Sequence, residues 1–580
     1  MKLVFDIETD GLKATKIWCI VAIDIKTDKV YSFNPDEIEE GIKLLQTADT
    51  LIGHNIIGFD IPVINRLKGV NLFENSNIID TLVLSRLFNP SRDGGHSLER
   101  WGFELQFHKD KQPEDFTEYT TDMLMYCIKD VRLNKKLFDH LKIEGKGFSK
   151  ESIELEHATT KVLSVQRNNG FKFDEKNAIF LLSSLNKRKK EIEEEVLETF
   201  KPKLIVDKIV MPHIKKDGKL SKKGLTKKEY ERYSNVLPSD IKPFPRQKIQ
   251  HFNLGSRKQI GEYLQDFGWK PTRFTPTGQP IVDEGTLKKI THIHEASLIA
   301  EFLLLQKRIA QVQSWVDAVE EDKRVHGFVM STGTITGRMA HRFPNMAQIP
   351  SVHNPYGIEC RSCWIVDSGY KLLGVDASQL ELRILAHYMD DKRYINEIIN
   401  GDIHTTNQEL AGLKSRDQAK TFIYALIYGA GDSKIGGIVK GSKAEGRRLR
   451  ERFLSRTPSF KSLRRRVDRA SQRGHLKGLD GRKITIRHQH AALNSLLQGG
   501  GAIVMKRGLV ILNNKLSKMG LDYKFVANIH DEWQLEVKED QAHIIGTLAV
   551  ESLRETAAYY TMRCPLDAEY KIGVNWSETH

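Results

Sequence analysis

The sequence contains few cysteines and no long apolar run. Its five cysteines lie at positions 19, 127, 360, 363 and 564, too scattered for a disulfide framework, which fits a reducing compartment. Cys360 and Cys363 form a lone CxxC pair without the further ligands that zinc needs, and we interpret them as small, partly buried residues. No apolar stretch approaches the roughly 20 residues of a membrane span. Asp6 interrupts the apolar start where a signal peptide would continue, so we expect no secretion and no membrane.

Internal repeats and low-complexity tracts are also absent. Hydrophobic residues make up 40% and charged residues 28% of the 580 residues. Each domain can therefore bury an ordinary core, and disorder is not expected as the main state. At roughly 150 residues per domain, we expect about four domains or subdomains.

Basic charge is unevenly distributed along the chain. The 89 Lys and Arg residues outnumber the 75 Asp and Glu residues, which gives a net charge of +14. Residues 1–150 carry 20 basic and 24 acidic residues, whereas residues 201–250 alone carry 14 basic and five acidic ones. A second basic run lies between residues 445 and 473. Such runs are typical of polyanion-binding surfaces, although solvated helix faces also produce them.

Residue patterns divide the chain into parts. Residues 1–150 alternate strand-like and helical runs, which indicates an α/β domain. Residues 152–200 have helical spacing broken at the turn signal Asn168-Asn169-Gly170, and they predict a long helical hairpin. The basic residues 201–250 indicate an extended or mobile insertion. A helix over 295–320, a strand over 371–375 and two late strands over 524–529 and 533–537 are predicted after it.

Acidic residues of the first part occur in a metal-binding pattern. Asp6 and Glu8 alternate on an apolar strand, so both carboxylates should project from one face. Asp60 ends an N-x₃-F-D motif, and Tyr126 and Asp130 form a Y-x₃-D motif on a helical stretch. Two hard divalent ions about 4 Å apart can stabilise the attacking and leaving oxygens of phosphodiester cleavage. Each acid alone could be an exposed cap, but the ordered combination is specific.

This combination resembles the DEDD-type 3′→5′ proofreading exonucleases whose third motif carries Tyr. The resemblance implies that Tyr126 orients the attacking water and that four acids hold two metal ions, namely Asp6, Glu8, Asp60 and Asp130. Because all four acids are present, we expect an active nuclease.

A second set of acids lies in the C-terminal part. Asp376 ends an apolar strand, and Asp531 and Glu532 lie between two strand-like runs that predict a hairpin. Between these segments, three residues spaced i, i+4 and i+8 give one helix face two cations for phosphates and a ring for stacking on a base. They are Arg416, Lys420 and Tyr424.

The C-terminal part resembles family A DNA polymerases, the DNA polymerase I type, and most of all the replicative polymerases of short-tailed phages. The three segments match motifs A, B and C in order. Further matches lie at Thr336–Arg338, Asn345–Pro350, Gly401–His404, Phe422–Gly431 and Gly478–Lys483. The resemblance covers the chain apart from the variable segment around 201–250.

The resemblance also implies roles for individual residues. Two Mg²⁺ ions, for which Mn²⁺ can substitute, would be held by Asp376, Asp531 and the backbone carbonyl of Ala377, and Glu532 is assigned to the same centre. Glu381 would abut the sugar C2′ and exclude ribonucleotides. The triphosphate and the incoming nucleotide would be contacted by His404, Arg416, Lys420 and Tyr424. The minor-groove side of the primer-template would be contacted by Arg338, Gln498 and His530.

The expected fold is multidomain, with a ribonuclease-H-like α/β exonuclease domain and a right-hand polymerase of palm, fingers and thumb. We place the exonuclease at residues 1–150 and a helical connection and thumb at 151–330, with a basic insertion near 205–250. Palm and fingers would occupy 331–580, with the fingers at about 391–510.

The expected partners follow from the same resemblance. They are primer-template DNA and deoxynucleoside triphosphates, together with a phage helicase-primase and a single-stranded-DNA-binding protein, in the cytoplasm of a bacterial host. Some phage relatives bind a thioredoxin-type processivity subunit through a longer basic insertion. The stretch from Val210 to Gln250 is shorter, which leaves thioredoxin dependence open.

Two rival functions share part of these patterns. A single-subunit phage-type RNA polymerase has the same two-acid palm and the same Arg/Lys/Tyr helix, but it has no reason to carry a nuclease. It should also have a small residue in place of Glu381. A non-catalytic nucleic-acid clamp on a degenerate polymerase is disfavoured by the intact acids of both centres.

Overall fold

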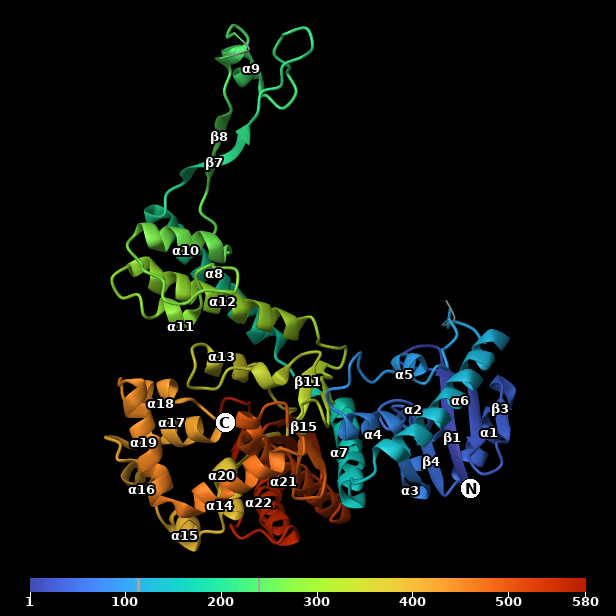
Figure 1. The fold of residues 1–580 in the computed structure, drawn as a ribbon. Coiled ribbons are helices and arrows are strands. Elements are labelled where there is room, and N and C mark those ends of the chain that lie inside the picture. Colours follow the sequence, from blue (N-terminus) through green and yellow to red (C-terminus); the bar gives the residue numbers. More distant parts are fainter. Residues whose placement is uncertain (112–114, 238–239) are drawn as a thin grey trace. The chain divides into compact units, whose positions relative to one another are not determined.

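The computed structural model describes residues 1–111, 115–237 and 240–580, which form two compact units (Figure 1). The first unit consists of Met1–Glu175 and Ala318–His580, and the second of Lys176–Asp317. In the first unit β6 (Phe171–Lys172) pairs antiparallel with β9 (Arg324–Val325), and Lys323 forms an ion pair with Glu175 at 2.9 Å. The chain therefore leaves this unit and returns to it at neighbouring positions.

The N-terminal part of the first unit is built on a five-stranded sheet with the order β3-β2-β1-β4-β5. Strand β1 is antiparallel to β2 and parallel to β4. Leu3, Phe5 and Ile7 of β1 pack on one face against helices α1 and α2, whereas Val4 packs on the other face against α6. The strands are β1 (Lys2–Thr9), β2 (Ile17–Asp24), β3 (Val30–Phe33), β4 (Thr50–Gly53) and β5 (Asn77–Asp80). The helices are α1 (Ile38–Gln46), α2 (Asp60–Lys68), α3 (Leu72–Asn75), α4 (Thr81–Phe88), α5 (Leu98–Glu104) and α6 (Thr121–Glu144).

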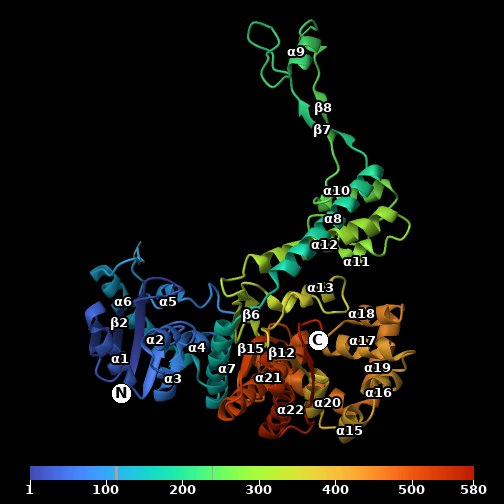
Figure 2. The same ribbon diagram turned by 180° about the vertical axis from the view of Figure 1, so that it is seen from behind.

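The C-terminal part is built on a four-stranded antiparallel sheet with the order β15-β16-β12-β17. Its core residues form one cluster with residues of α14 (Leu380–Met389), α21 (Ala492–Lys518) and α22 (Ala542–Tyr559). Figure 2 shows α21 and α22 beside the sheet from behind. The strands are β12 (Tyr370–Ala377), β15 (Tyr523–Ile529), β16 (Glu532–Lys538) and β17 (Ala568–Gly573). The strands expected over 371–375, 524–529 and 533–537 are thus confirmed.

Helix α21 explains an apolar segment that sequence patterns passed over. The stretch Gln489–Lys518 is long and apolar enough to cross a membrane, but 83% of its most apolar window is buried inside the fold. It packs against α22, α14 and α7 (Lys150–Asn169). We therefore interpret α21 as a core helix.

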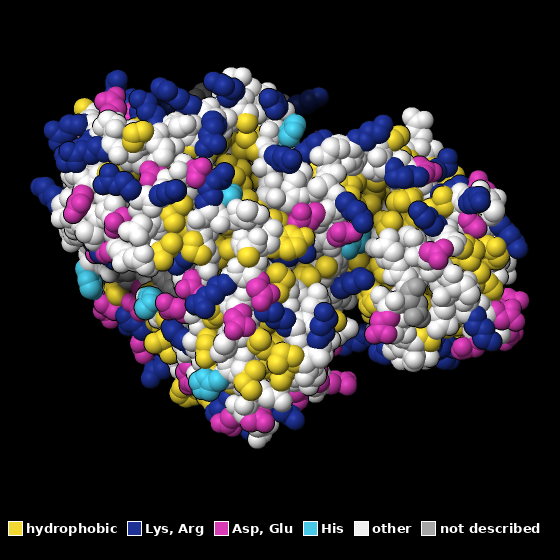
Figure 3. All heavy atoms as spheres, turned by 90° about the horizontal axis from the view of Figure 1, so that it is seen from below, with side chains coloured by type: hydrophobic (Ala, Val, Ile, Leu, Met, Phe, Trp, Pro, Cys, Tyr) yellow, Lys and Arg dark blue, Asp and Glu magenta, His cyan; other side chains and the backbone are white. Residues whose placement is uncertain are grey.

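A run of helices between β12 and α21 forms the region predicted as fingers. Figure 3 shows Lys and Arg side chains gathered at one end of the face seen from below, on the side where these orange helices lie in Figure 1. The helices are α15 (Lys392–Asn400), α16 (Ile403–Ala411), α17 (Arg416–Ile427), α18 (Asp432–Ile438), α19 (Lys443–Arg456) and α20 (Pro458–Ser471). A small hairpin of β13 (His475–Lys477) and β14 (Lys483–Thr485) follows.

The second unit consists of helices and one projecting hairpin (Figure 1). The expected extended insertion is an antiparallel pair of β7 (Lys203–Val210) and β8 (Phe244–Gln250). The helices are α8 (Glu175–Thr199), α9 (Lys227–Tyr233), α10 (Arg257–Asp266), α11 (Glu284–Leu287) and α12 (His294–Val316). Helix α12 confirms the helix predicted over 295–320.

The predicted helical hairpin over 152–200 is wrong in its packing. Two helices are present, α7 and α8, but α7 packs against α21 and β15 and lies in the first unit. The domain boundary predicted at residue 151 therefore does not coincide with the boundary between the compact units, which lies after Glu175. The turn signal at Asn168–Gly170 predicts a tight turn between two helices, whereas the chain there enters strand β6.

Short elements complete the first unit. They are β10 (Phe328–Met330), β11 (Ala340–Arg342), α13 (Gly357–Ser362) and the 3₁₀ turns η1 (Pro35–Glu37), η3 (Met346–Gln348), η4 (Gln489–Ala491) and η5 (Glu539–Gln541).

Candidate active sites

The first acid cluster forms where β1 meets α2 and α6. Asp6 and Glu8 lie on β1, Asp60 begins α2, and Asp130 lies on α6 one turn after Tyr126. Asp60 accepts the backbone N–H of Ile7 at 3.2 Å. The structure thus brings together the four acids that the sequence pattern picked out.

The carboxyl groups of this cluster have raised pKa values. Burial, and then the neighbouring carboxylates, raise the pKa of Asp6 well above its ordinary value and that of Glu8 to about 8. Burial also raises the pKa of Asp60 to about 7 and raises that of Asp130. Carboxylates crowded in this way repel one another unless cations compensate them.

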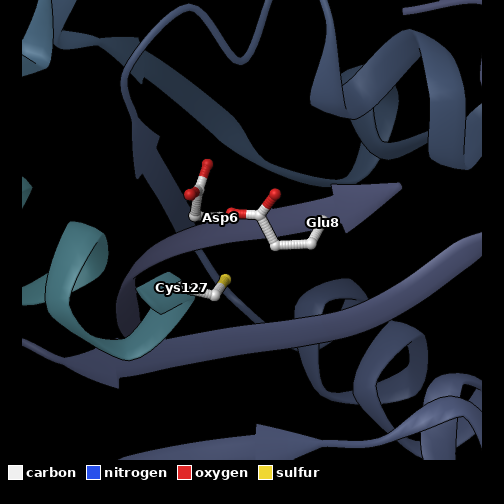
Figure 4. Close-up of side chains that lie close together, drawn as sticks. All are labelled: Asp6, Glu8 and Cys127. Carbon is white, nitrogen blue, oxygen red and sulfur yellow. The ribbon is translucent and has the colours of Figure 1, made fainter. Parts of the chain in front are cut away.

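Cys127 borders the same cluster. Ligand atoms of Asp6, Glu8 and Cys127 all lie within 4.8 Å of one another, and Figure 4 shows the sulfur pointing toward the two carboxylates. Cys127 is fully buried, and burial raises the pKa of its thiol well above the usual value, so it stays protonated. A thiol is a poor ligand for a hard ion, whereas carboxylate oxygens suit Mg²⁺.

One atom of the cluster lacks a protein partner. Asp130 is 4% exposed, and its Oδ1 is buried without a hydrogen bond among the described residues. Its Oδ2 forms an ion pair with Lys109 at 2.5 Å, and the Lys109 Nζ lies 4.7 Å from the centre of the Tyr126 ring. A buried, unpaired carboxylate oxygen beside three other acids fits a bound divalent cation.

The second acid cluster forms at the ends of β12 and the β15–β16 turn. Asp376 pairs across the sheet with Glu532 on one side and Glu569 on the other. The backbone N–H of Ala377 donates to the carbonyl of Asp531 at 3.0 Å, which brings the two predicted metal-binding segments together. Asp376 is open to solvent at the strand end, yet partial burial, then Asp531 and Glu532, raise its pKa to about 7.

Glu532 is held differently from the two aspartates. It is 5% exposed and accepts hydrogen bonds from Trp576 Nε1 at 2.7 Å and from Gln534 Nε2 at 2.5 Å. The His580 ring contacts its other oxygen at 3.0 Å, and despite burial these partners lower the pKa of Glu532. Burial instead raises the pKa of Asp531. Glu532 thus lies within a protein hydrogen-bond network, and its catalytic role stays a prediction.

Helix α17 carries the predicted basic face. Ser415 caps its start by accepting the backbone N–H of Gln418, and Lys420 is exposed on it. Arg416 is occupied, because its guanidinium binds both oxygens of Asp402, at 2.6 and 3.2 Å. His404 follows Asp402 at the start of α16, and its Nδ1 is buried without a protein partner among the described residues.

Glu381 links two segments of the C-terminal part. One carboxylate oxygen accepts Arg338 at 2.8 Å and the other accepts the hydroxyl of Tyr428 at 2.8 Å. Arg338 also lines a small cavity with His530 and Glu532. Gln498 is half-buried on α21, and within the described part of the chain it forms no hydrogen bond with these residues.

Several residues of these sites were missed by the sequence patterns. Tyr428 lies one helical turn after Tyr424, and the ring centres are 6.2 Å apart, so the helix spacing could have revealed it. Lys109 gave no signal, because it lies outside any helix or strand.

Comparisons with known proteins agree with this geometry. The model of DNA polymerase family A matches residues 227–578. The DNA-directed DNA polymerases of Enterobacteria phage T3 and Escherichia phage T7 are 34% and 32% identical to this chain, with 100% of each chain covered in both cases. A DNA polymerase I of Pseudomonas aeruginosa is 29% identical over 57% of this chain and 39% of its own.

A solved structure has a similar fold. The polymerase domain of Pol1 from M. smegmatis, in complex with a DNA primer-template and a dNTP, superposes with a TM-score of 0.78 at 18% identity. The match covers 100% of this chain and 96% of that one.

Proposed function

Because this chain belongs to DNA polymerase family A and is a DNA-directed DNA polymerase of the phage type, we propose that it also proofreads. It would extend a primer at the Asp376/Asp531 centre and remove mispaired 3′ nucleotides at the Asp6/Glu8/Asp60/Asp130 cluster. The observation that carries the proposal is the presence of two separate, complete carboxylate clusters in one chain.

Both clusters fit divalent cations. Burial, and then the neighbouring carboxylates, raise the pKa values of Glu8 and Asp376, and Asp130 has a buried oxygen without a partner among the described residues. Mg²⁺ would be held by Asp376, Asp531 and the carbonyl of Ala377 in one centre and by the four acids in the other, with Mn²⁺ as a substitute. When bound, such ions supply charge stabilisation for phosphoryl transfer and favour a deprotonated nucleophile.

The side chains of the fingers would bind the nucleotide. Lys420 and His404 offer donors to the triphosphate, and Arg416 would exchange the Asp402 carboxylate for a phosphate. Tyr424 would pack against the nucleotide, and Glu381, held by Arg338 and Tyr428, would stand beside the sugar. Arg338, Gln498 and His530 would contact the minor-groove side of the new pair.

At the nuclease centre, Tyr126 would orient the attacking water. Lys109 lies against both Tyr126 and Asp130, and it would fix the ring and the carboxylate in place. The unpaired 3′ end has room beside the acids, because a groove lined by Asp6, Phe59, Asp60 and Arg66 runs past them.

Substrates and setting follow from the relatives. The complex of the Pol1 domain with primer-template and dNTP supports the same ligands here. The phage relatives support action in the cytoplasm of a bacterial host. A helicase-primase, a single-stranded-DNA-binding protein and a thioredoxin-type subunit stay predictions from the resemblance.

Separate removal of each centre tests the proposal. Asp376→Ala should abolish primer extension and leave degradation of single-stranded DNA intact. Asp6→Ala with Glu8→Ala should abolish degradation and leave extension intact. Both activities are measured on a 5′-labelled primer with Mg²⁺, and circular dichroism controls for folding. If either variant stayed folded and lost both activities, the two-centre proposal would be wrong.

A further inference from the structure

The basic run between residues 445 and 473 lies on helices α19 and α20, whose cations differ in their ion pairs. On α19, the exposed Arg447 binds Glu451 at 2.8 Å and Arg448 binds Glu445 at 2.6 Å, and Arg450 binds Asp432. The charges of these three residues on α19 are therefore compensated within the fold.

The charge of α20 is not compensated in this way. Lys461, Arg465 and Arg469 are exposed, and none has a carboxylate within ion-pair distance among the described residues. They are spaced i, i+4 and i+8, so they form one stripe with a rise of about 6 Å per step. Like charges at this spacing disfavour a helix. The three side chains form a line of cations. The distance between neighbouring cations is comparable to the spacing of phosphates along an extended nucleic-acid strand.

The chain that follows the stripe returns to the end of α17, the helix proposed to bind the nucleotide. Just beyond α20, the carbonyl of Gly474 accepts the N–H of Ile486 at 2.9 Å. The chain then presents the exposed rings of His488 and His490, stacked with their centres 5.4 Å apart and their planes 10° apart. The carbonyl of His490 lies against Gly429 at the end of α17, where an added Cβ would come within 2.3 Å of it.

We propose that the α20 stripe, formed by Lys461, Arg465 and Arg469, binds the phosphates of the single-stranded template ahead of the active site. Unpaired cations followed by flat exposed rings are the combination that holds single-stranded nucleic acid without sequence preference. The chain after the stripe carries the exposed rings of His488 and His490 and then contacts the end of α17. This connection favours the template over an acidic peptide, which would not need to reach the nucleotide site.

Binding measurements on matched variants test the proposal. Arg465→Gln with Arg469→Gln removes two charges from the stripe, and Arg447→Gln with Arg448→Gln removes two compensated charges from α19. Both are made in full-length protein carrying Asp6→Ala, so that DNA is not degraded. Each protein is titrated with dye-labelled primer-templates of identical duplex, whose template overhang is two or twenty nucleotides long, over a range of salt concentrations.

The stripe variant should bind the long-overhang DNA more weakly. Its log–log salt slope on that DNA should fall by about 1.4, since each lost single-strand phosphate contact removes about 0.7. The slope on the short-overhang DNA should not change, and the α19 variant should match the parent on both. If the stripe variant lost affinity equally for both DNAs, the stripe would bind duplex. If the stripe and α19 variants lost affinity equally, the effect would come from net charge alone. Either result would overturn the proposal, as would unchanged DNA binding.

The same variants test whether the stripe binds DNA or an acidic peptide. A dye-labelled fifteen-residue polyglutamate peptide should bind the stripe variant and the parent alike. If the stripe variant lost peptide binding and kept DNA binding, the surface would serve an acidic protein and the proposal would fail. The inference rests on the proposed polymerase function only for its choice of ligand. Because binding is measured without catalysis, a failure here is distinguishable from a loss of extension in the Asp376 test.

Discussion

Tyr424 lies on the face of α17 that also carries Arg416 and Lys420. Its side chain is half-buried, and burial, then Glu381 and Asp531, raise the pKa of its hydroxyl. The phenol therefore stays protonated. A protonated hydroxyl at this position can donate a hydrogen bond to the triphosphate of a nucleotide whose sugar has no 3′-hydroxyl.

Tyr424→Phe should make the enzyme reject dideoxynucleotides. One hydrogen bond to a charged group contributes about 1.5–3 kcal/mol, which corresponds to roughly ten- to a hundredfold in selectivity. Incorporation of ordinary deoxynucleotides should stay near normal, because their own 3′-hydroxyl remains. The measurement is the ratio of kcat/KM for dideoxy and deoxy substrates in an Asp6→Ala background, where proofreading cannot remove the terminator. Equal ratios for Tyr and Phe would remove this role from Tyr424.

At the scale of elements, one buried carboxylate of helix α7 forms hydrogen bonds and ion pairs with three distant segments. Glu156 is fully buried, and its Oε2 accepts the hydroxyl of Thr332 at 2.9 Å. Its Oε1 accepts Arg482 at 2.6 Å and Lys506 at 2.5 Å. Arg482 in turn binds the buried Asp480. This network joins α7 to the loop before Arg338, to the β13–β14 hairpin and to α21.

Glu156→Gln should destabilise the fold by about 3–5 kcal/mol, the usual cost of removing one partner from a buried charge network. Urea unfolding followed by tryptophan fluorescence measures the change. Glu154→Gln is the matched control, because Glu154 lies on the same helix and its ion pair with Lys150 is exposed. Exposed pairs contribute about 0–1 kcal/mol, and similar losses in both variants would contradict the role given to Glu156.

The same residue should make stability fall in acid. Despite full burial, Lys506 and Arg482 lower the pKa of Glu156 from 4.5 to about 2. The folded state therefore binds fewer protons than the unfolded state between these values, so the contribution is present above pH 4.5 and is lost as pH falls through 2. The difference in unfolding free energy between wild type and Glu156→Gln should shrink over this window. A constant difference from pH 6 to pH 2 would contradict the prediction.

The sequence could show the acids of both centres but not this network. Asp6 and Glu8 alternate on an apolar strand and Asp376 lies near the end of another, and on a strand every second side chain points to the same face by local geometry alone. Glu156 follows the ordinary apolar spacing of a helix, and its partners lie at 332, 482 and 506, so only the fold brings them together. Likewise, α7 and α8 were predicted from spacing, whereas the packing of α7 on α21 depends on contacts far apart in the chain.

At the scale of the whole molecule, the second unit carries much of the excess charge on its projecting hairpin. Six lysines lie exposed between β7 and β8, namely Lys215, Lys216, Lys222, Lys223, Lys227 and Lys228. Several cations on the helices of this unit are instead paired, such as Lys190 with Glu194, Lys258 with Glu262 and Lys288 with Glu284.

Replacement of the six lysines by Gln should weaken binding to duplex DNA and flatten its salt dependence. Each lost phosphate contact removes about 0.9 from the log–log slope on duplex. A parallel variant with Lys190→Gln, Lys258→Gln and Lys288→Gln controls for charge within the same unit. If the slope did not change, or changed equally per charge in the control, the hairpin lysines would be only a solvated face.

The pairing of β6 with β9 has a consequence for how such a polymerase can vary. Because the chain leaves the first unit at Glu175 and returns beside it at Lys323, the ends of the intervening segment are already held together. A segment whose ends meet can be shortened, enlarged or exchanged as a cassette without threading the remaining chain differently. Exchange of this one continuous stretch would therefore alter the second unit, including its lysine-rich hairpin, while the sheets that carry both acid clusters keep their framework.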